Sequence, residues 1–233
     1  MHTSKLALIL VAGGTGERAE RNIPKQFVEI HQKPVIVYSL ESFLKYQTGM
    51  KVVVVVHTKY IDYSRALIQK YFPKAENIHI ASGGETRFHS VKNGLIYLNT
   101  LNFDGLVAVH DAARPCVPVS LIKRCFETAQ QYGNSIPAVP LSESIRQKRE
   151  HHQSTMVDRT QFVIVQTPQC AHFSVLYKAF QMPYKDLFTD EANVLETFGE
   201  QIYLCEGDKN NIKLTYPIDF ELASIILKQE TYE

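Results

Sequence analysis

The stretch LALILVA at residues 6–12 runs directly into GGTGER at 13–18, and PKQ follows at 24–26. An apolar run that ends in a glycine-rich turn predicts a buried strand followed by a loop whose backbone N–H groups can approach phosphate oxygens, because glycine has no side chain. Arg18 and Lys25 add two fixed positive charges to this loop. The segment therefore predicts a loop that wraps a polyphosphate, and a phosphate-handling enzyme is the first hypothesis.

Beyond this stretch, apolar β-branched segments alternate with amphipathic ones. We expect strands at 6–12, 52–57, 78–81, 106–110, 135–139, 162–165 and 201–205, and helices at 35–46, 60–71, 89–98, 120–132, 174–180, 191–198 and 218–229. Nearly continuous apolar strands such as VVVVV at 52–56 are typical of a parallel sheet covered on both faces. The pattern predicts an α/β fold: a three-layer α/β/α sandwich with a mostly parallel, Rossmann-like sheet and ligands beyond the carboxyl ends of the strands.

The segment 141–161 interrupts this alternation. It is polar and charged, with RQKREHHQ at 146–153. Two interpretations remain open, a protruding β-hairpin arm and a surface loop. No linker or repeat divides the chain, so we expect a single domain over 1–233 that carries this excursion.

Composition excludes several classes of protein. The 233 residues are 45% hydrophobic, and 25 Lys and Arg against 24 Asp and Glu give a formal charge of +1, which does not fit a general nucleic-acid or membrane-surface binder. The four cysteines are scattered, which favours reduced buried thiols over a disulfide or a zinc site. The first apolar run is too short for a signal peptide, and none reaches the roughly 20 residues of a membrane span. We expect a cytoplasmic protein.

The glycine segment has a competing explanation. Residues 14–19 fit the G-x-G-x-x-A pattern of dinucleotide-binding proteins. That site needs a helix directly behind the glycines, which Pro24 would interrupt, and an acid at the end of the second strand, where His57 stands instead. An NAD-binding oxidoreductase is therefore disfavoured.

HDAARP at 110–115 follows a buried strand. Asp111 at the end of that strand is a hard oxygen ligand suited to Mg²⁺, the usual companion of a nucleoside triphosphate. The alternative is that Asp111 caps the next turn and pairs with Arg114. Lys213, in NNIKLT at 210–215, is by itself most simply a surface charge.

GGETRFHS at 83–90 is a second glycine turn after a strand. Its backbone N–H groups and Ser90 are candidates for contact with a base or a phosphate, and a plain capped helix start is equally consistent with the pattern. Likewise FTDEA at 188–192 reads as an ordinary helix start with acids in its first turn.

In their order along the chain, AGGTGER with PKQ, GGETRFHSV, HDAARP, DR, QTPQ, FTDEA and NIKLT resemble the motifs of the 2-C-methyl-D-erythritol 4-phosphate cytidylyltransferases of the non-mevalonate isoprenoid pathway. The resemblance extends over about 6–227. It implies transfer of a cytidylyl group from CTP to a polyol phosphate, giving 4-diphosphocytidyl-2-C-methyl-D-erythritol and pyrophosphate.

The resemblance also implies a role for each matching position. The nucleotide would be bound by Ala12, Gly13, Gly14, Gly16, Gly84 and Ser90. The catalytic cations would be Arg18, Lys25 and Lys213. The sugar phosphate would contact Asp111, Arg114, Ser144, Arg159, Thr167 and Thr189, and Asp111 would also contact Mg²⁺.

In the family the excursion is an arm that crosses to a second subunit, so the resemblance implies a homodimer in which Arg159 enters the partner's active site. Ser144 stands where threonine is common and keeps the hydroxyl, whereas Asn210 stands where an acid is common. A CTP:ribitol 5-phosphate cytidylyltransferase shares the glycine loop and the NIK-type motif and remains the alternative. The intact HDAARP and the pair Asp158-Arg159 favour the isoprenoid enzyme.

Overall fold

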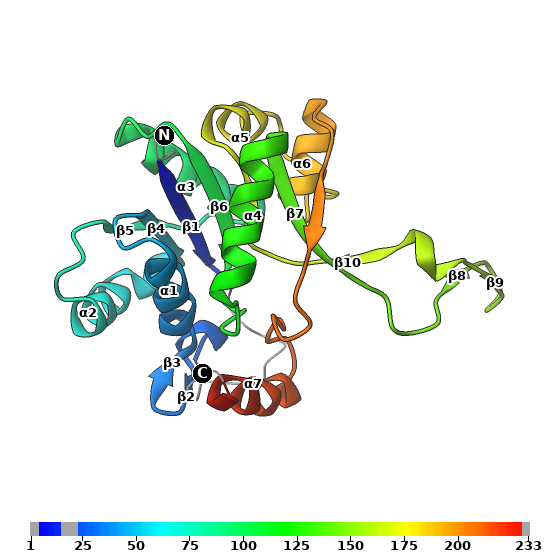
Figure 1. Ribbon diagram of the computed structural model, residues 1–233, viewed down its shortest axis with the longest axis horizontal. Helices are drawn as coiled ribbons and strands as arrows, with labels where there is room; N and C mark the ends of the chain where they lie inside the picture. Colours follow the sequence, from blue (N-terminus) through cyan, green and yellow to red (C-terminus); the bar gives the residue numbers. More distant parts are fainter. Residues whose placement is uncertain (1–4, 15–22, 230–233) are drawn as a thin grey trace.

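The computed structural model describes residues 5–14 and 23–229. A mixed sheet forms the centre of the molecule and has helices on both faces (Figure 1). Its parallel part has the order β5-β4-β1-β6, made of β1 (Leu6–Ala12), β4 (Lys51–Val56), β5 (Ile78–Ser82) and β6 (Leu106–Asp111). These strands are apolar along nearly their whole length because both faces are covered.

The second part of the sheet is mixed: β10 and β11 run against the parallel strands, whereas β7 and β12 run in the same direction as they do. Strand β11 (Gln169–His172) lies antiparallel between β6 and β7 (Asn134–Pro140). Strand β7 also pairs with β10 (Val163–Val165) in antiparallel and with β12 (Leu204–Glu206) in parallel orientation. Since Ala138 of β7 pairs with both Val165 and Glu206, β10 and β12 lie on opposite edges of β7.

Alternate residues of β1 enter two separate cores. Leu8 and Leu10 pack with α1 (Val35–Tyr46), α2 (Ile61–Tyr71) and α4 (Val119–Tyr132). On the opposite face, Ala7 and Ile9 pack with α3 (Arg87–Thr100), α5 (Phe173–Ala179) and α6 (Glu191–Phe198). This is the period-two alternation expected of a buried strand, and it confirms the three layers.

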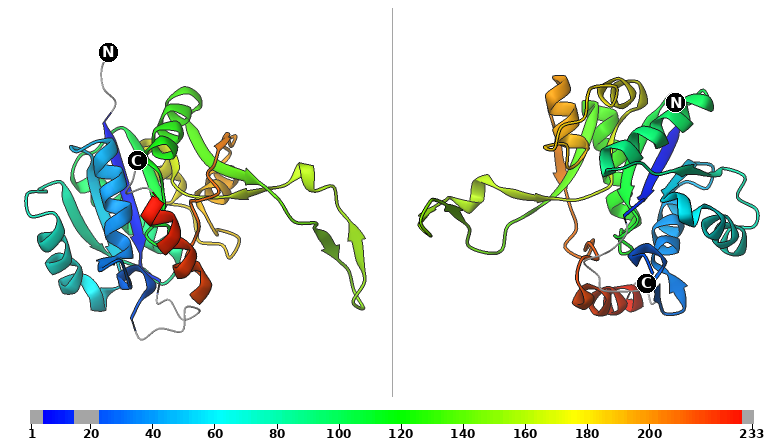
Figure 2. Two further views of the ribbon diagram at one scale, coloured as in Figure 1. Left: turned by 60° about the horizontal axis from the view of Figure 1, so that its bottom comes forward. Right: turned by 180° about the vertical axis from the view of Figure 1, so that it is seen from behind.

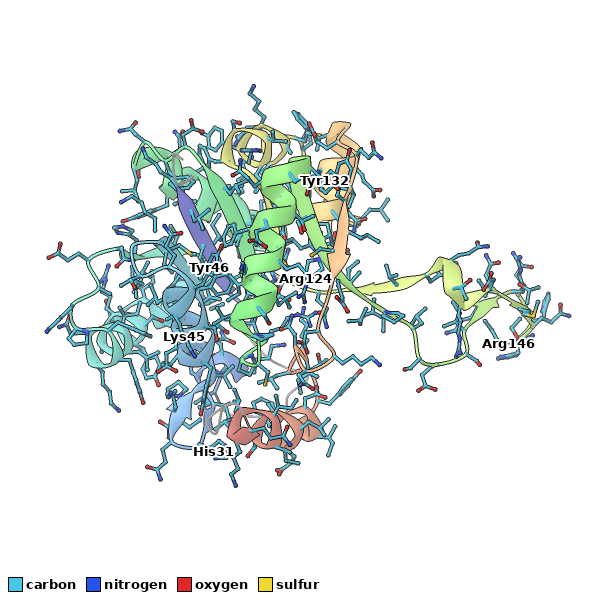
Figure 3. The ribbon with its side chains drawn as sticks, viewed as in Figure 1. His31, Lys45, Tyr46, Arg124, Tyr132 and Arg146 are labelled. Carbon is cyan, nitrogen blue, oxygen red and sulfur yellow. The ribbon has the colours of Figure 1, made fainter. Side chains whose placement is uncertain are left out.

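A smaller third core lies beneath the sheet in Figure 1. Helix α7 (Pro217–Gln229) contributes Phe220, Ala223 and Leu227 to it. Ile30 of β2 (Glu29–Ile30), the strand that forms a hairpin with β3 (Lys33–Pro34), belongs to the same core. On the face of the sheet toward the viewer, Arg124 of α4 donates from Nε to the carbonyl of Glu206 over 2.7 Å, which ties that helix to β12 (Figure 3).

The segment 141–161 leaves the body of the molecule as an extended arm (Figures 1 and 2). Strands β8 (Arg146–Lys148) and β9 (Ser154–Met156) pair in antiparallel orientation along it. Arg146 lies far out on the arm, where its Nε donates to Ser154 Oγ over 2.7 Å (Figure 3). Of the two interpretations of this segment, the hairpin arm is the one observed.

Most expected elements are confirmed within a few residues, and the helices 35–46 and 191–198 coincide with α1 and α6. The short strand β11 and the hairpin of β2 and β3 were not expected. Polar residues flank β11, which hid a strand of four residues, and its antiparallel direction makes the sheet mixed.

All four cysteines are buried, and Cys125 Sγ lies 3.6 Å from Cys205 Sγ. Within the described part of the chain, no helix has the length and apolar character needed to cross a membrane.

Candidate active site

A cavity of about 460 Å³ opens at the carboxyl edge of the parallel strands. Six separate segments of the chain form its wall. They supply Val11, Ala12, Gly13, Gly14, Lys25, Gln26, His57, Gly84, Glu85, Thr86, Arg87, Ser90, Asp111, Ala112, Ala113 and Lys213. Ligands of open α/β sheets bind at this edge, so the cavity is the candidate site.

The first glycine loop is fastened by a buried amide. Gln26 Nε2 donates to the carbonyl of Ala12 over 2.7 Å and to that of Gly14 over 3.1 Å. Gln26 is only 3% exposed, and its bond to Ala12 is buried. Gly16 and Arg18 lie outside the described residues.

The second glycine segment is shaped by Ser90. Ser90 Oγ accepts from the backbone N–H of Gly84 over 3.1 Å and donates to the carbonyl of Thr86 over 3.0 Å. A side chain at Gly84 would collide with His89, so only glycine fits there. Thr86 caps α3 by accepting from the N–H of His89, so the capped helix start is real and also forms cavity wall.

Asp111 ends β6 and is 7% exposed. Its two oxygens bind different cations: Oδ1 accepts from Arg87 Nε over 3.0 Å, and Oδ2 lies 2.7 Å from Lys213 Nζ. The alternative that Asp111 pairs with Arg114 is therefore wrong. Arg114 instead donates from Nη1 to the carbonyl of Asn211 over 2.8 Å.

Arg87 joins Asp111 to a second buried acid. Its Nη1 and Nη2 donate to Glu191 Oε1 and Oε2 over 2.6 and 3.0 Å. Burial alone would raise the pKa of Asp111, but the charges of Arg87, Lys213 and Arg114 hold it well below its usual value. Burial also raises the pKa of Glu191, and Arg87 opposes that rise.

The two candidate lysines approach the cavity from adjacent backbone segments. Lys25 Nζ donates to the carbonyl of Leu214 over 2.8 Å. Leu214 in turn donates its N–H to the carbonyl of Ala113, two residues after Asp111, over 2.8 Å. Lys213 was by itself most simply a surface charge, but the structure brings it to the cavity with its side chain 43% exposed.

Buried hydrogen bonds from Thr167 and His110 hold the backbone around Asp111. Thr167 Oγ1 accepts from the N–H of Asp111 over 3.1 Å and lies 3.0 Å from His110 Nδ1. His110 Nε2 lies 3.2 Å from the carbonyl of Arg114, which accepts only if Nε2 carries the hydrogen, so Nδ1 accepts from Thr167. Burial, the largest influence, lowers the pKa of His110 to about 4, consistent with a neutral ring.

The remaining candidate residues lie away from the cavity wall. Thr167 and Arg114 lie behind it, and Thr189 Oγ1 accepts from Asn193 Nδ2 over 2.9 Å at the start of α6. Ser144 and Arg159 belong to the arm, where Arg159 Nη1 donates to the carbonyl of Ser142 over 2.6 Å. Within the described residues of a single chain, these five side chains do not line the cavity.

Sequence reasoning assigned no role to Gln26, His57 and Arg87, which line the cavity, or to Glu191, which binds Arg87. Gln26 and Arg87 stood inside quoted motifs, which was the available signal. Glu191 was interpreted as a first-turn acid. Its partner Arg87 is 104 positions away, and no local pattern reports a contact over that separation.

Two glycine segments, two lysines and a strand-end carboxylate around one cavity at the carboxyl edge of an α/β sheet define the site of a nucleotidyltransferase. Comparison with known proteins agrees. A family model described as 2-C-methyl-D-erythritol 4-phosphate cytidylyltransferase matches residues 6–229. The cytidylyltransferase of that name from Bacteroides thetaiotaomicron is 39% identical over 96% of this chain and 100% of its own length.

A relative of the same name from Thermosipho melanesiensis is 34% identical over 93% of this chain and 95% of its own length. Among solved structures, the Francisella tularensis 2-C-methyl-D-erythritol 4-phosphate cytidylyltransferase superposes with a TM-score of 0.79 at 31% identity, covering 96% of this chain and 100% of that one.

The chain belongs to the 2-C-methyl-D-erythritol 4-phosphate cytidylyltransferase family. It catalyses the CTP-dependent cytidylylation of 2-C-methyl-D-erythritol 4-phosphate in non-mevalonate isoprenoid precursor synthesis. The resemblance found in the sequence is thereby confirmed. This assignment is preferred to the ribitol 5-phosphate and NAD-dependent alternatives.

Proposed function

We propose that the cavity holds both substrates and that its residues divide between nucleotide, reacting phosphates and sugar phosphate. The observation that carries this proposal is the convergence of Lys25, Asp111 and Lys213 with both glycine segments on one cavity. Both substrates are anions, so the barrier that the protein can lower consists mainly of charge repulsion and misorientation.

The nucleotide is assigned to the two glycine segments. Ala12, Gly13 and Gly14 form one side of the cavity, and Gly84 and Ser90 form another. A side chain at Gly13 would press on Ser90 Oγ, 3.1 Å from the added Cβ, so the two segments approach closely only because glycine is present. Gly16 belongs to this assignment by sequence position alone.

In the proposed reaction the phosphate monoester of the substrate attacks the α-phosphorus of CTP in line, and pyrophosphate leaves. Lys25 and Lys213 neutralise the charge that develops on the α-phosphate and on the leaving group, together with Arg18 by sequence position. The attacking phosphate is already ionised at neutral pH, so no general base is required.

The donor set fits Mg²⁺ that is held mainly by the nucleotide. Among the described residues, no group of three or more His, Cys, Asp or Glu side chains could hold a metal ion. Mg²⁺ in nucleotide sites is commonly bound by one or two carboxylates plus substrate phosphates. Asp111 lines the cavity, and its Oδ2 lies 2.7 Å from Lys213 Nζ. Asp111 would hold the ion, which when bound supplies further neutralisation of the triphosphate. Lys213 would then exchange Asp111 for a phosphate oxygen.

The arm is proposed to build a homodimer in which the sugar-phosphate pocket is completed by the partner. Its base is apolar and uncovered: Phe162, Val163, Ile164 and Val165 are each 40% exposed or more. Contiguous exposed apolar surface of this kind is typical of an interface. Ser144 and Arg159 lie on the arm, away from their own cavity, so they would act in the partner's site. Arg114, Thr167 and Thr189 would support the sugar-phosphate side.

Pyrophosphate release tests this division directly. We expect release only when CTP and 2-C-methyl-D-erythritol 4-phosphate are both present, with an absolute need for a divalent cation and with light scattering reporting a dimer. Full turnover with excess chelator would remove Asp111 from a metal role. A monomer with full activity would remove the arm from the site.

A further inference from the structure

Glu191 is an unusual residue for the start of a helix because it is almost completely buried, at 1% exposed. Acids in a first turn normally face water, where they interact weakly with the helix dipole. Both oxygens of Glu191 instead accept from the two terminal nitrogens of Arg87. An arginine–carboxylate pair with two parallel bonds fixes orientation as well as charge.

A separate set of bonds places Glu191 at this position. Gln169 of β11 donates from Nε2 to Asp190 Oδ2 over 3.0 Å and accepts from the N–H of Ala192 over 3.0 Å. Gln169 is paired with Val109 of β6, two residues before Asp111. The start of α6 is therefore clamped beside the carboxyl end of β6, and Arg87 bridges the gap between them.

The charged side chains of this cluster differ in their exposure to solvent. Glu191 is fully buried, the Arg87 side chain is 23% exposed, and the Asp111 side chain is 10% exposed. One guanidinium faces two carboxylates, so Lys213 supplies the second positive charge, from a side chain 43% exposed. Asp111 Oδ1 is thus held by the buried partner, while Oδ2 is held by the one that can leave for solvent or for a ligand.

We propose that Glu191 and Arg87 are positioning residues for Asp111. Glu191 holds the guanidinium of Arg87, and Arg87 Nε holds Asp111 Oδ1, so that Oδ2 stays directed into the cavity. Arg87 lines the cavity, but its guanidinium is already paired with the carboxylates of Asp111 and Glu191. We therefore assign Arg87 to Asp111 and not to the phosphates. This proposal rests on the proposed role of Asp111.

A cluster that served stability alone would behave differently. Replacing both members of a buried ion pair by apolar residues of similar volume often leaves a protein as stable as before, whereas removing one member leaves an unpaired buried charge. The two roles can therefore be separated. A variant with apolar residues at both position 87 and position 191 should recover stability, but it should not restore the positioning of Asp111.

The experiment compares E191Q, R87K and the double variant R87M/E191M with wild type and with E41Q as a matched control. Glu41 forms a half-buried pair with Lys33 outside the site. We expect E191Q to lower kcat by about 10- to 100-fold, the range that misplacement of a reacting group produces. The KM for CTP should stay within about 3-fold, while the Mg²⁺ concentration for half-maximal rate rises.

R87K keeps a charge but cannot bond both Glu191 oxygens and Asp111 together, so we expect activity between wild type and E191Q. The double variant leaves no unpaired charge at position 191 and keeps Lys213 beside Asp111, so it should regain most of the stability that E191Q loses and remain as slow as E191Q. Wild-type kcat in E191Q, or in a double variant that is folded, would overturn the proposal. If E191Q fails to fold, the double variant alone decides.

D111N, measured beside them, separates this proposal from the one on which it rests. A slow D111N with a normal E191Q means that Asp111 acts without needing the pair. A normal D111N means that the role assigned to Asp111 is itself wrong, and the positioning proposal fails with it.

Discussion

Asp111 Oδ2 and Lys213 Nζ lie 2.7 Å apart at the wall of the cavity, joining residues from the end of β6 and from the segment before α7. The pair places a carboxylate in the wall of a cavity that must receive two anions, and Lys213 compensates its charge. The Lys213 side chain is 43% exposed, so this partner of Asp111 has room to turn toward a ligand. We interpret it as the unliganded arrangement of a charge cluster that reorganises around the nucleotide.

Neutralising Asp111 tests this interpretation. In D111N we expect kcat to fall by about 100-fold, because an amide neither holds Mg²⁺ as a carboxylate does nor pairs with Lys213. Mg²⁺ titrations of the rate should show weaker activation. D62N is the control, since Asp62 lies in an exposed pair with Arg65 on α2. Unchanged metal dependence in D111N would contradict the role.

Removal of the Gln26 amide should loosen the first glycine loop. Q26A loses two bonds to the carbonyls of Ala12 and Gly14, and each such bond contributes about 1 kcal/mol. We expect the KM for CTP to rise by about 5- to 30-fold with a smaller change in kcat. Q181A, at an exposed position just after α5, serves as the control. A larger loss in kcat than in KM would show that the amide acts elsewhere.

Acid should destabilise the protein through His110. Its pKa is lowered from 6.5 to about 4, mainly by burial, so the unfolded state binds more protons between these values and stability rises with pH across the window. Acidification from pH 6.5 to 4 should therefore remove about 3 kcal/mol of unfolding free energy through this residue.

The measurement is the free energy of unfolding against pH for wild type and H110Q. The variant should show a shallower slope between pH 6.5 and 4. Burial also lowers the pKa of His79, which adds to the slope in both proteins and cancels in the comparison. Parallel curves would show that His110 is not the group concerned.

The dimer proposal predicts that two inactive variants rescue each other. R159A should damage only the partner's site, and K213A only its own. After subunit exchange in an equal mixture, about a quarter of the sites should be intact, because half the dimers are mixed and each has one complete site. Activity near that fraction is expected from two preparations that are each nearly inactive. Absence of any recovery, with exchange shown by mass, would place Arg159 in its own subunit's site.

The layers of the fold could be predicted because they depend on local pattern. Strand β1 is apolar on both faces, and the amphipathic helix 35–46 begins and ends where the pattern predicted. Strand β11 could not be predicted in this way. Its residues are buried by neighbours on both sides, and only its pairing with β6 and β7 reveals its antiparallel direction.

The site likewise contains residues that a local sequence pattern predicts and contacts that it does not. Lys25 and Asp111 carried signals in their own motifs, a cation after a glycine loop and an acid at a strand end. The sequence around Lys213 carries almost no such signal, and only the family resemblance assigns it to the site. The bonds of Arg87 to Glu191 and of Thr167 to His110 form between segments 104 and 57 positions apart. Only the folded chain specifies those contacts.

The kcat of pyrophosphate release by K213A tests the central claim most directly, with K25A measured beside it and K209A, an exposed lysine of the same segment, as the control. If these lysines neutralise charge in the transition state, kcat should fall by about 10²- to 10³-fold in each, as when one donor to a transition state is lost, while the fold persists. A fall of less than about 3-fold in correctly folded K213A and K25A would contradict the account, since a transition-state donor is worth far more than that.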